Sequence, residues 1–253
     1  MVMGTDNPMN KSLRISFVLP VLNETYSLKQ TVDTIFELAP DELHEVLIIT
    51  AERTTSESLA VIDTIQKEHA AQVRVHRQRL PFLGGAMQEA FDIASGEHVM
   101  LMASDLETDP ALIPAFVEKI KEDRWDIVAG SRWIEGGGFE GYSRMKLALN
   151  YLFQRIFRIF YHTTVTDLTF AYRLYRKSLL EGMRWEELKH PFLLECLLKP
   201  LRCGARVAEI PCTWRARTEG ASASLFLETF AYLRIALKVR FLPLSRLRRG
   251  KTQ

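Results

Sequence analysis

Short apolar segments alternate with amphipathic segments along the first half of the chain, and this alternation restricts the possible folds more than any other feature. Apolar runs predict strands at 13–20, 45–50, 72–78, 98–103 and 126–131. Apolar residues at helical spacing predict helices between them, at 27–39, 56–69, 86–94 and 110–121. A strand-helix-strand order of this kind is typical of α/β proteins, so we expect a mainly parallel sheet with helices on both faces.

The composition indicates a globular protein that is neither fibrous nor disordered. The 253 residues, of which 47% are hydrophobic and 25% charged, suffice for one large domain with or without an appendage. No apolar run reaches about 18 residues, and the N-terminus lacks the apolar core of a signal peptide. The three cysteines lack CxxC spacing, which favours free thiols. We therefore expect a cytoplasmic protein that does not span a bilayer.

The segment after residue 132 has a different character. A glycine-rich stretch at 136–144 is expected to be a mobile loop that closes over a ligand. A helix is predicted at 145–160, followed by a strand and helix within 168–183, a helix within 191–204 and an edge strand within 205–214. The apolar face of the 145–160 helix comprises Leu149, Leu152, Phe153, Ile156 and Phe160, and Arg155, Arg158 and His162 lie opposite.

The end of the chain combines large apolar residues with basic ones. Residues 225–253 include Arg234, Lys238, Arg240, Arg246, Arg248, Arg249 and Lys251 against Glu228 as the only acid. Such a helix can lie at a membrane surface, where anionic lipid attracts each basic residue by about 1 kcal/mol, or it can pack on the domain, or both. Stacking aromatic residues are missing after Phe241, so no nucleic-acid partner is expected. The predicted regions are a flexible 1–12, a domain at 13–224, and a C-terminal amphipathic helix and tail at 225–253.

Three acidic residues follow the predicted strand at 98–103. Asp105, Glu107 and Asp109 would repel one another unless a cation lay nearby. Ligands of α/β sheets bind at the carboxyl ends of the strands, and Mg²⁺ or Mn²⁺ takes carboxylate oxygens. Asp109, next to Pro110, is expected to cap the following helix. From the residues alone, Asp105 and Glu107 are either metal ligands or solvated acids.

Other strand-end segments offer residues suited to an anionic ligand. Thr50 and Ser104 end their strands or follow them directly. Gly84 and Gly85 precede a predicted helix, where glycine permits close backbone approach and presents amide groups to a phosphate, although Gly-Gly is more often only a turn.

Five segments stand in an order that is characteristic of one enzyme family. They are VLPVLNE at 18–24, LGGAMQEAFDIASGEHVMLMASDLETDP at 83–110, VAGSRW at 128–133, TDLTFAYRLYRKSL at 166–179 and EIPCTWRARTEGASAS at 209–224. Together they resemble family 2 glycosyltransferases, which have the Rossmann-like GT-A fold. The likeness is strongest to the polyprenyl-phosphate branch, which is similar to dolichol-phosphate mannose synthase.

This resemblance implies a nucleotide-sugar donor over the strand ends, with Mg²⁺ or Mn²⁺ on its diphosphate. By matching position, Pro20 and Glu24 are similar to nucleotide contacts, and Asp105 and Glu107 fall on the metal motif Asp-x-Asp-x-Gln. The nucleotide set is thus Pro20, Glu24, Thr50, Gly84, Gly85, Ser104 and Asp105.

The same resemblance assigns residues to catalysis. Arg132 matches a phosphate-binding arginine, Asp167 and Arg173 match a "D…GFR" motif, and Arg217 begins an "R…GxSK" motif with Gly220 and Ser222. The catalytic set is Asp105, Arg132, Asp167, Arg173 and Arg217. We expect Asp167 to brace Arg173 or a helix start.

Several positions depart from the family pattern. Ala103 replaces the first aspartate of the metal motif, and 50–53 read Thr-Ala-Glu-Arg where the family has DDGS. Ala171 and Ala223 replace a glycine and a lysine. These losses leave a metal with fewer protein ligands.

The leading hypothesis is a metal-dependent, inverting transfer of a hexose from a GDP- or UDP-sugar to a polyprenyl phosphate. Such an acceptor is already anionic and needs arginines more than a base; Arg132, Arg144, Arg173 and Arg217 are candidates, with Arg144 better explained as a surface residue. A glycan or small-molecule hydroxyl acceptor would need a base, for which Asp167 is the candidate. A degenerate member that binds a nucleotide without transfer is the third hypothesis.

Overall fold

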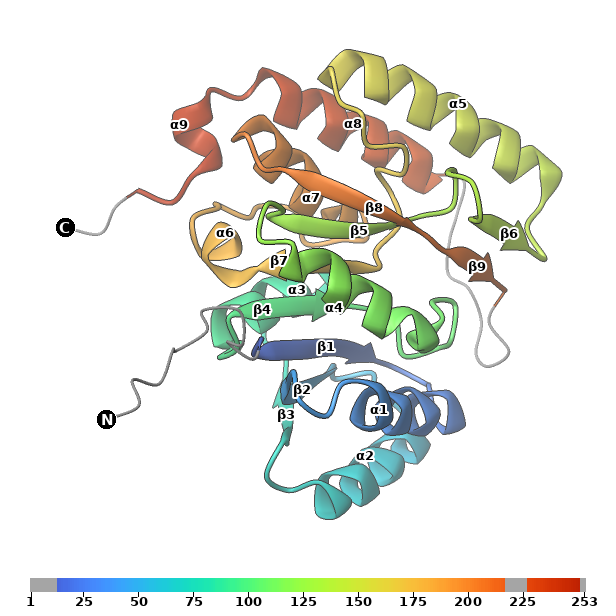
Figure 1. Ribbon diagram of the computed structural model, residues 1–253, viewed down its shortest axis with the longest axis vertical. Helices are drawn as coiled ribbons and strands as arrows, with labels where there is room; N and C mark the ends of the chain where they lie inside the picture. Colours follow the sequence, from blue (N-terminus) through green and yellow to red (C-terminus); the bar gives the residue numbers. More distant parts are fainter. Residues whose placement is uncertain (1–12, 217–226, 251–253) are drawn as a thin grey trace, which may run out of the picture.

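A seven-stranded sheet forms the centre of the protein in the computed structural model, which describes residues 13–216 and 227–250 (Figure 1). The strands are β1 (Ile15–Val21), β2 (Leu43–Thr50), β3 (Val73–Arg77), β4 (His98–Leu101), β5 (Ile127–Ser131), β7 (Arg173–Arg176) and β8 (Val207–Pro211). Their spatial order is β3-β2-β1-β4-β7-β5-β8, and β7 runs antiparallel to both of its neighbours. All other pairs are parallel, which confirms the predicted α/β class.

Helices cover both faces of this sheet, as the alternation along the sequence predicts. One face packs against α1 (Tyr26–Leu38), α2 (Ser56–Glu68) and α4 (Ile113–Lys121), the last preceded by the 3₁₀ turn η1 (Pro110–Leu112). The other packs against α3 (Phe82–Ile93), α6 (Lys177–Glu181), α7 (Phe192–Arg202) and α8 (Leu227–Phe241). Successive residues of β1 alternate between the two cores: Phe17 and Leu19 enter the first, and Val18 enters the second.

Two local predictions were wrong. The helix expected to begin at residue 86 begins at Phe82, so Gly84 and Gly85 lie inside α3 rather than before it. The glycine-rich stretch at 136–144 is not wholly a loop. It contains β6 (Gly138–Glu140), which pairs with β9 (Thr213–Arg215) as a separate small sheet beside the carboxyl end of β5.

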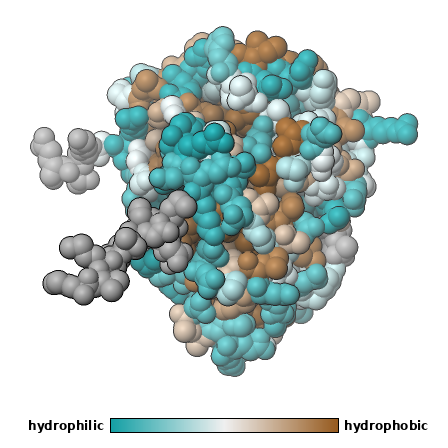
Figure 2. Space-filling view, viewed as in Figure 1, coloured by the Kyte–Doolittle hydropathy of each residue, from teal (hydrophilic) through white to brown (hydrophobic). Residues whose placement is uncertain are grey.

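The long helix α5 (Arg144–Tyr161) lies beside α8 along the top of Figure 1. Its predicted apolar face is split by the structure. Phe153 and Phe160 pack against the core, whereas Leu149, Leu152 and Ile156 are exposed. In Figure 2, hydrophobic residues lie among hydrophilic ones at the top of the molecule, where α5 and α8 run in Figure 1.

The C-terminal helix α8 is docked on the domain. Ile235, Ala236 and Val239 are buried against α7, and Arg202 of α7 donates hydrogen bonds to the carbonyls of Val239 and Leu242. The short helix α9 (Leu244–Leu247) follows. No helix within 13–216 and 227–250 combines the length and the apolar character needed to cross a bilayer. The predicted boundary at 224–225 and the predicted flexible 1–12 lie outside the described residues.

Stability is expected to fall as the pH is lowered because of His98, which begins β4 and is buried. Among the described residues, neither of its ring nitrogens has a hydrogen-bond partner. Burial, aided by the Arg176 charge, lowers the pKa of His98 from 6.5 to about 4. The unfolded chain therefore binds a proton more readily than the folded one between these values, and stability present above pH 6.5 is lost as the pH falls. Between pH 7.5 and 5 this group should remove about 2 kcal/mol from the free energy of unfolding.

Urea unfolding of the wild type and His98→Leu across this pH range measures the effect. The variant should show the shallower pH dependence. Equal slopes for the two proteins would contradict the assignment to His98.

Candidate active site

The carboxyl ends of β1, β2 and β4 meet at one edge of the sheet and bring four predicted site residues together. Ser104 follows β4, and its hydroxyl donates to the carbonyl of Pro20 at the end of β1, at 2.7 Å. Thr50 ends β2, where it pairs in register with Val21. Asp105 is next to Ser104 and almost fully buried. The adjacent strand ends expected from a parallel sheet thus form one rim.

Asp105 and Glu107 flank a tight backbone turn at this rim. Leu106 between them has φ of 62°, a left-handed conformation that is uncommon for a residue with a side chain and concentrates at functional sites. Asp105 Oδ1 accepts the Glu107 N–H at 3.0 Å, and the Glu107 carboxylate accepts Trp214 Nε1–H from β9 at 3.2 Å. The turn therefore holds both carboxylates in defined positions.

The third acid of the segment has the structural role predicted for it. Asp109 caps η1 by accepting the Ala111 N–H at 2.9 Å, and it pairs with Arg215 of β9 at 3.1 Å.

The carboxylates available for a metal are few. Within the described part of the chain, no three His, Cys, Asp or Glu side chains come together as a metal site. Mg²⁺ is often held by only one or two carboxylates together with substrate phosphates, and Asp105 and Glu107 match that donor set. The residues present thus suit an ion that arrives with, or is completed by, a diphosphate.

Arg132 and Asp167 form a buried ion pair at the end of β5. Arg132 Nε and Nη2 donate to the two carboxylate oxygens of Asp167 at 2.6 and 2.9 Å. The guanidinium also lies against the rings of Phe139 and Phe170, with centroid distances of 4.9 and 4.7 Å. Within the described residues, Nη1 of Arg132 has no acceptor. One edge of the guanidinium, Nε and Nη2, is therefore committed to Asp167, whereas Nη1 is not.

The carboxylate of Asp167 is saturated with donors. It is 0% exposed and accepts backbone N–H groups from Arg132, Thr169 and Phe170 as well as the guanidinium. Burial alone would raise the pKa of Asp167, but the Arg132 charge and these hydrogen bonds outweigh it and lower the pKa below its usual value. The group is ionised and enclosed, which suits a brace and not a proton acceptor. The residue it braces is Arg132, so the expected pairing with Arg173 was wrong.

Three residues that the sequence reasoning missed complete this cluster. Gln154 of α5 donates to Thr169 Oγ1 at 2.9 Å and accepts the Leu168 N–H at 2.8 Å. Thr169 Oγ1 in turn accepts from Arg132 Nη2 at 3.0 Å. Glu209 of β8 accepts the N–H groups of Thr166 and Asp167, and burial raises the pKa of its carboxyl. Gln154 lies outside the apolar face predicted for its helix, so no sequence pattern pointed to it.

Arg173 lies beneath this cluster, in the interior. It is 0% exposed and donates to the carbonyls of Leu168 and Leu193 at 2.9 and 2.6 Å. Its guanidinium thus holds the backbone next to Asp167 against α7, and the side chain has no exposed surface for a ligand to contact.

A row of aromatic side chains connects the acidic turn, with Asp105 and Glu107, to the ion pair of Arg132 and Asp167. Trp214, whose indole contacts Glu107, packs on Tyr142, which packs on Phe139, and Phe139 packs on Trp133, with centroids 4.8–5.0 Å apart. Phe139 also lies under Arg132. The strand β6 therefore connects the acidic turn to the ion pair.

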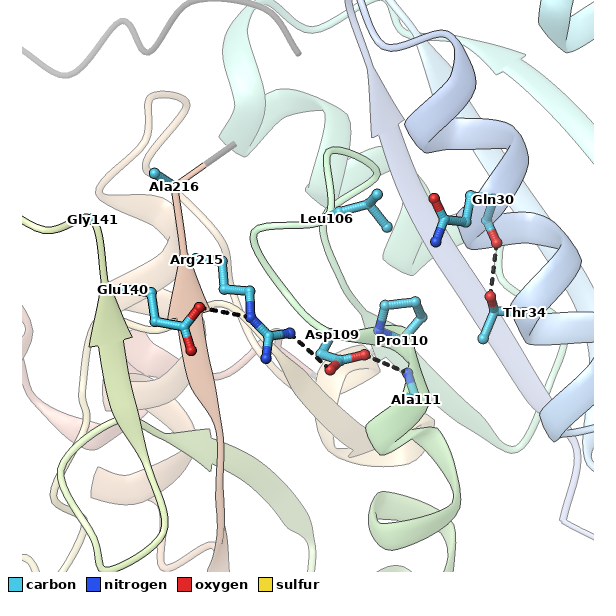
Figure 3. A pocket seen from close by; sticks show the side chains of 10 residues that line it. All are labelled: Gln30, Thr34, Leu106, Asp109, Pro110, Ala111, Glu140, Gly141, Arg215 and Ala216. Carbon is cyan, nitrogen blue, oxygen red and sulfur yellow. Dashed lines mark hydrogen bonds and ion pairs between the residues drawn. The ribbon is translucent and has the colours of Figure 1, made fainter. Parts of the chain in front are cut away.

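A cavity of about 580 Å³ lies beside the acidic turn (Figure 3). Its wall includes Leu106 and Asp109 of the turn, Gln30 of α1, and Glu140 and Arg215 of the small sheet. Arg215 bridges Glu140 and Asp109 at 3.0 and 3.1 Å, as Figure 3 shows. None of the predicted site residues within 13–216 lines this cavity, so it is not assigned to the donor.

The remaining predicted residues have local structural contacts. Glu24 accepts the N–H groups of Leu22 and Asn23, so its carboxylate folds back onto its own loop. The amide of Gly85 donates to the Leu188 carbonyl and is not available to a phosphate. Arg217, with Gly220 and Ser222, lies outside the described residues.

Gly84 is required for packing. A Cβ at this position would lie 2.5 Å from the Glu187 carbonyl oxygen and 2.7 Å from that of Leu188, both backbone atoms. Gly84→Ala is therefore expected to lower the free energy of unfolding by about 2 kcal/mol. Gly182→Ala is a matched control, because the nearest atom to its Cβ would be 3.7 Å away. Denaturant unfolding of both variants tests this; equal, small losses would contradict the packing role.

Comparison with known proteins agrees with this arrangement. The model of glycosyl transferase family 2 matches residues 16–184. Dodecaprenyl-phosphate galacturonate synthase of Rhizobium johnstonii is 26% identical over 251 residues, which cover 98% of this chain and 72% of that protein. Dolichol-phosphate mannosyltransferase of Pyrococcus furiosus is 25% identical over 224 residues, covering 88% and 62%. Glycosyltransferase AglD of Haloferax volcanii is 26% identical over 211 residues, but the match covers only 34% of its length.

Solved structures give the same fold. Glucosyl-3-phosphoglycerate synthase from Mycobacterium tuberculosis in complex with UDP superposes with a TM-score of 0.71 at 17% identity, covering 93% of this chain and 83% of that one. The same enzyme with Mn²⁺, UDP and phosphoglyceric acid gives a TM-score of 0.69. These likenesses confirm the expected GT-A fold. The family match spans more than half of the chain and includes the acidic turn, Arg132, Asp167 and Arg173, and the chain therefore belongs to glycosyl transferase family 2.

Proposed function

We propose that this glycosyltransferase moves a hexose from a GDP- or UDP-linked donor to a polyprenyl phosphate, with inversion and with Mg²⁺ or Mn²⁺. The observation that carries the choice of acceptor is the enclosure of Asp167. A hydroxyl acceptor needs a general base, and the one acid that the motifs offer as a base is 0% exposed and fully hydrogen-bonded. A phosphate acceptor is already anionic and needs only to be held.

Each group of residues has a part in this proposal. Pro20, Glu24, Thr50 and Ser104 surround the nucleotide at the strand ends. Asp105 and Glu107 hold the divalent ion, which when bound offsets the charge that develops on the departing diphosphate. Arg132, through Nη1, and Arg217 bind phosphate oxygens. Arg173 holds the backbone of Leu168 and thereby positions the neighbouring Asp167.

The transfer itself balances without a protein base. A phosphate oxygen of the acceptor attacks the anomeric carbon of the sugar as the bond from that carbon to the nucleoside diphosphate breaks. The nucleoside diphosphate leaves with the bonding electron pair. One displacement of this kind inverts the anomeric configuration, and the lipid acceptor sets the reaction at a membrane surface, on its cytoplasmic face.

The names of two relatives support the acceptor class, since each includes a polyprenyl phosphate: dodecaprenyl phosphate in one and dolichol phosphate in the other. The test incubates the full chain with labelled UDP- and GDP-hexoses, Mn²⁺ and a short-chain polyprenyl phosphate. A lipid-linked sugar that fails to form when the metal is chelated is the expected result. If product formed only on the hydroxyl of a glycan or a small molecule, a hydroxyl acceptor would be favoured over a polyprenyl phosphate. Binding of a nucleoside diphosphate without any transfer would favour a degenerate member.

A further inference from the structure

The outward side of α5 is an apolar stripe that the rest of the described chain leaves exposed. Met145, Leu149, Leu152, Ile156 and Ile159 recur at helical spacing, and all are exposed, from 43% for Leu149 to 74% for Ile159. The inward side of the same helix carries the buried Gln154 and Phe157. The helix therefore has two apolar sides, and the domain core uses only one of them.

α8 extends this exposed surface. Phe230, Leu233, Leu237 and Phe241 form a second outward stripe, with Phe241 at 74% exposure, and Leu244 continues it. The two helices are in direct contact: Tyr161 donates to the Ala236 carbonyl at 2.6 Å, and the rings of Phe160 and Phe241 lie 5.9 Å apart. Together the two stripes form a docking face, defined as the exposed apolar residues of α5 and α8. An apolar surface of this extent on one side of a protein marks an interaction site.

The charged residues around the docking face indicate what kind of partner it fits. α5 has four basic residues, Arg144, Lys146, Arg155 and Arg158, and no acidic residue. In the regions that the structure describes, none of these four has an acidic side chain within ion-pair distance. On α8, Arg234 and Lys238 are neutralised by Glu187 and Glu186. A second copy of this chain would bring the α5 cations against each other, whereas an anionic lipid surface complements them.

The inward side of α5 connects the docking face to the catalytic cluster. Gln154 holds Thr169 and Leu168, and Trp133 beside Arg132 packs on Tyr151 at 5.4 Å. A helix with its side chains is about 10–12 Å across, so Arg132 would lie roughly one helix diameter from a lipid surface that touches the stripe. That distance suits a phosphate at the level of the lipid headgroups.

We propose that α5 and α8 dock this protein on an anionic bilayer, with their outward stripes in the interface, and that α5 thereby sets the depth of Arg132 relative to the lipid phosphates. The part concerning depth rests on the proposed function; the docking does not.

The test is co-sedimentation of the full chain with vesicles of phosphatidylcholine, with and without phosphatidylglycerol. The wild type should bind the anionic vesicles at least about tenfold more tightly, and less tightly as salt is raised. The double variant Leu152→Glu/Ile156→Glu should lose at least about tenfold of that affinity. Leu59→Glu is the matched control, because Leu59 is 47% exposed on α2, on the other side of the sheet. Circular dichroism verifies that each variant is folded.

Equal vesicle binding by the wild type and the double variant, or none by the wild type, would overturn the docking. So would a wild-type dimer in sedimentation velocity that the double variant converts to a monomer without change in vesicle binding. Transfer is measured separately. The folded double variant should retain transfer to a detergent-dispersed short polyprenyl phosphate and lose it to a long one embedded in vesicles. Absence of transfer in every arm would reject the proposed function and leave the vesicle result standing.

Discussion

Asp105→Asn is expected to lower hexose transfer by at least about 100-fold, because it removes one of only two carboxylates that the acidic turn offers to a divalent ion. The substitution is nearly isosteric. An asparagine Oδ1 can still accept the Glu107 N–H, so the turn should persist. The loss is then one of charge and metal affinity rather than of shape.

The measurement is the initial rate of transfer as Mn²⁺ is titrated, together with calorimetry of nucleoside diphosphate binding with and without the ion. The variant should bind the nucleotide with a reduced dependence on Mn²⁺. Asp109→Asn is the control, since Asp109 belongs to the same segment but caps η1 and pairs with Arg215. Similar rates for the wild type and Asp105→Asn would remove the acidic turn from the mechanism.

Asp167→Asn is expected to destabilise the fold by about 3 kcal/mol and to reduce transfer as well. Breaking a buried ion pair leaves the partner charge uncompensated, and Arg132 has only 7% of its side chain exposed. The Asp63–Lys67 pair is a control on the surface, with 59% and 74% of its side chains exposed, and Asp63→Asn should cost less than about 1 kcal/mol. Denaturant unfolding gives both values.

The two roles considered for Asp167 differ in pH dependence. If Asp167 is a brace, Asp167→Asn lowers the rate of transfer at every pH and leaves the shape of the pH–rate profile unchanged. A general base would contribute its own ionisation to the wild-type profile, and Asp167→Asn would remove that limb. A lost limb with unchanged stability would therefore restore Asp167 as a base and favour a hydroxyl acceptor.

Most of the sheet could be predicted from the sequence, because the buried face of each strand and helix produces a regular spacing of apolar residues. β1 and β2 were placed within two residues of their observed bounds, and α1 and α2 within one. The start of α3 was missed for a non-local reason. Gly84 and Gly85 read as a helix breaker. The lack of a side chain admits the 187–188 backbone at Gly84 and Leu80 at Gly85, and this close packing compensates for the weak helix propensity of glycine.

The candidate site was predictable where neighbouring strand ends impose proximity, as for Pro20, Ser104 and Asp105. It was not predictable where the partners come from separate parts of the chain. Asp167 is six residues before Arg173, yet its partner is Arg132, 35 residues earlier. Gln154 and Glu209 join the same cluster from a helix and an edge strand.

The alternating elements, the two-sided sheet and the acidic turn after the fourth strand follow from the amino-acid sequence, since apolar periods and strand ends are local properties. The folded protein was needed to show which arginine Asp167 neutralises, why Gly84 must be glycine and which side of α5 faces solvent. Those outcomes depend on contacts between distant segments, and a helix with two apolar sides cannot indicate by itself which one the core will cover.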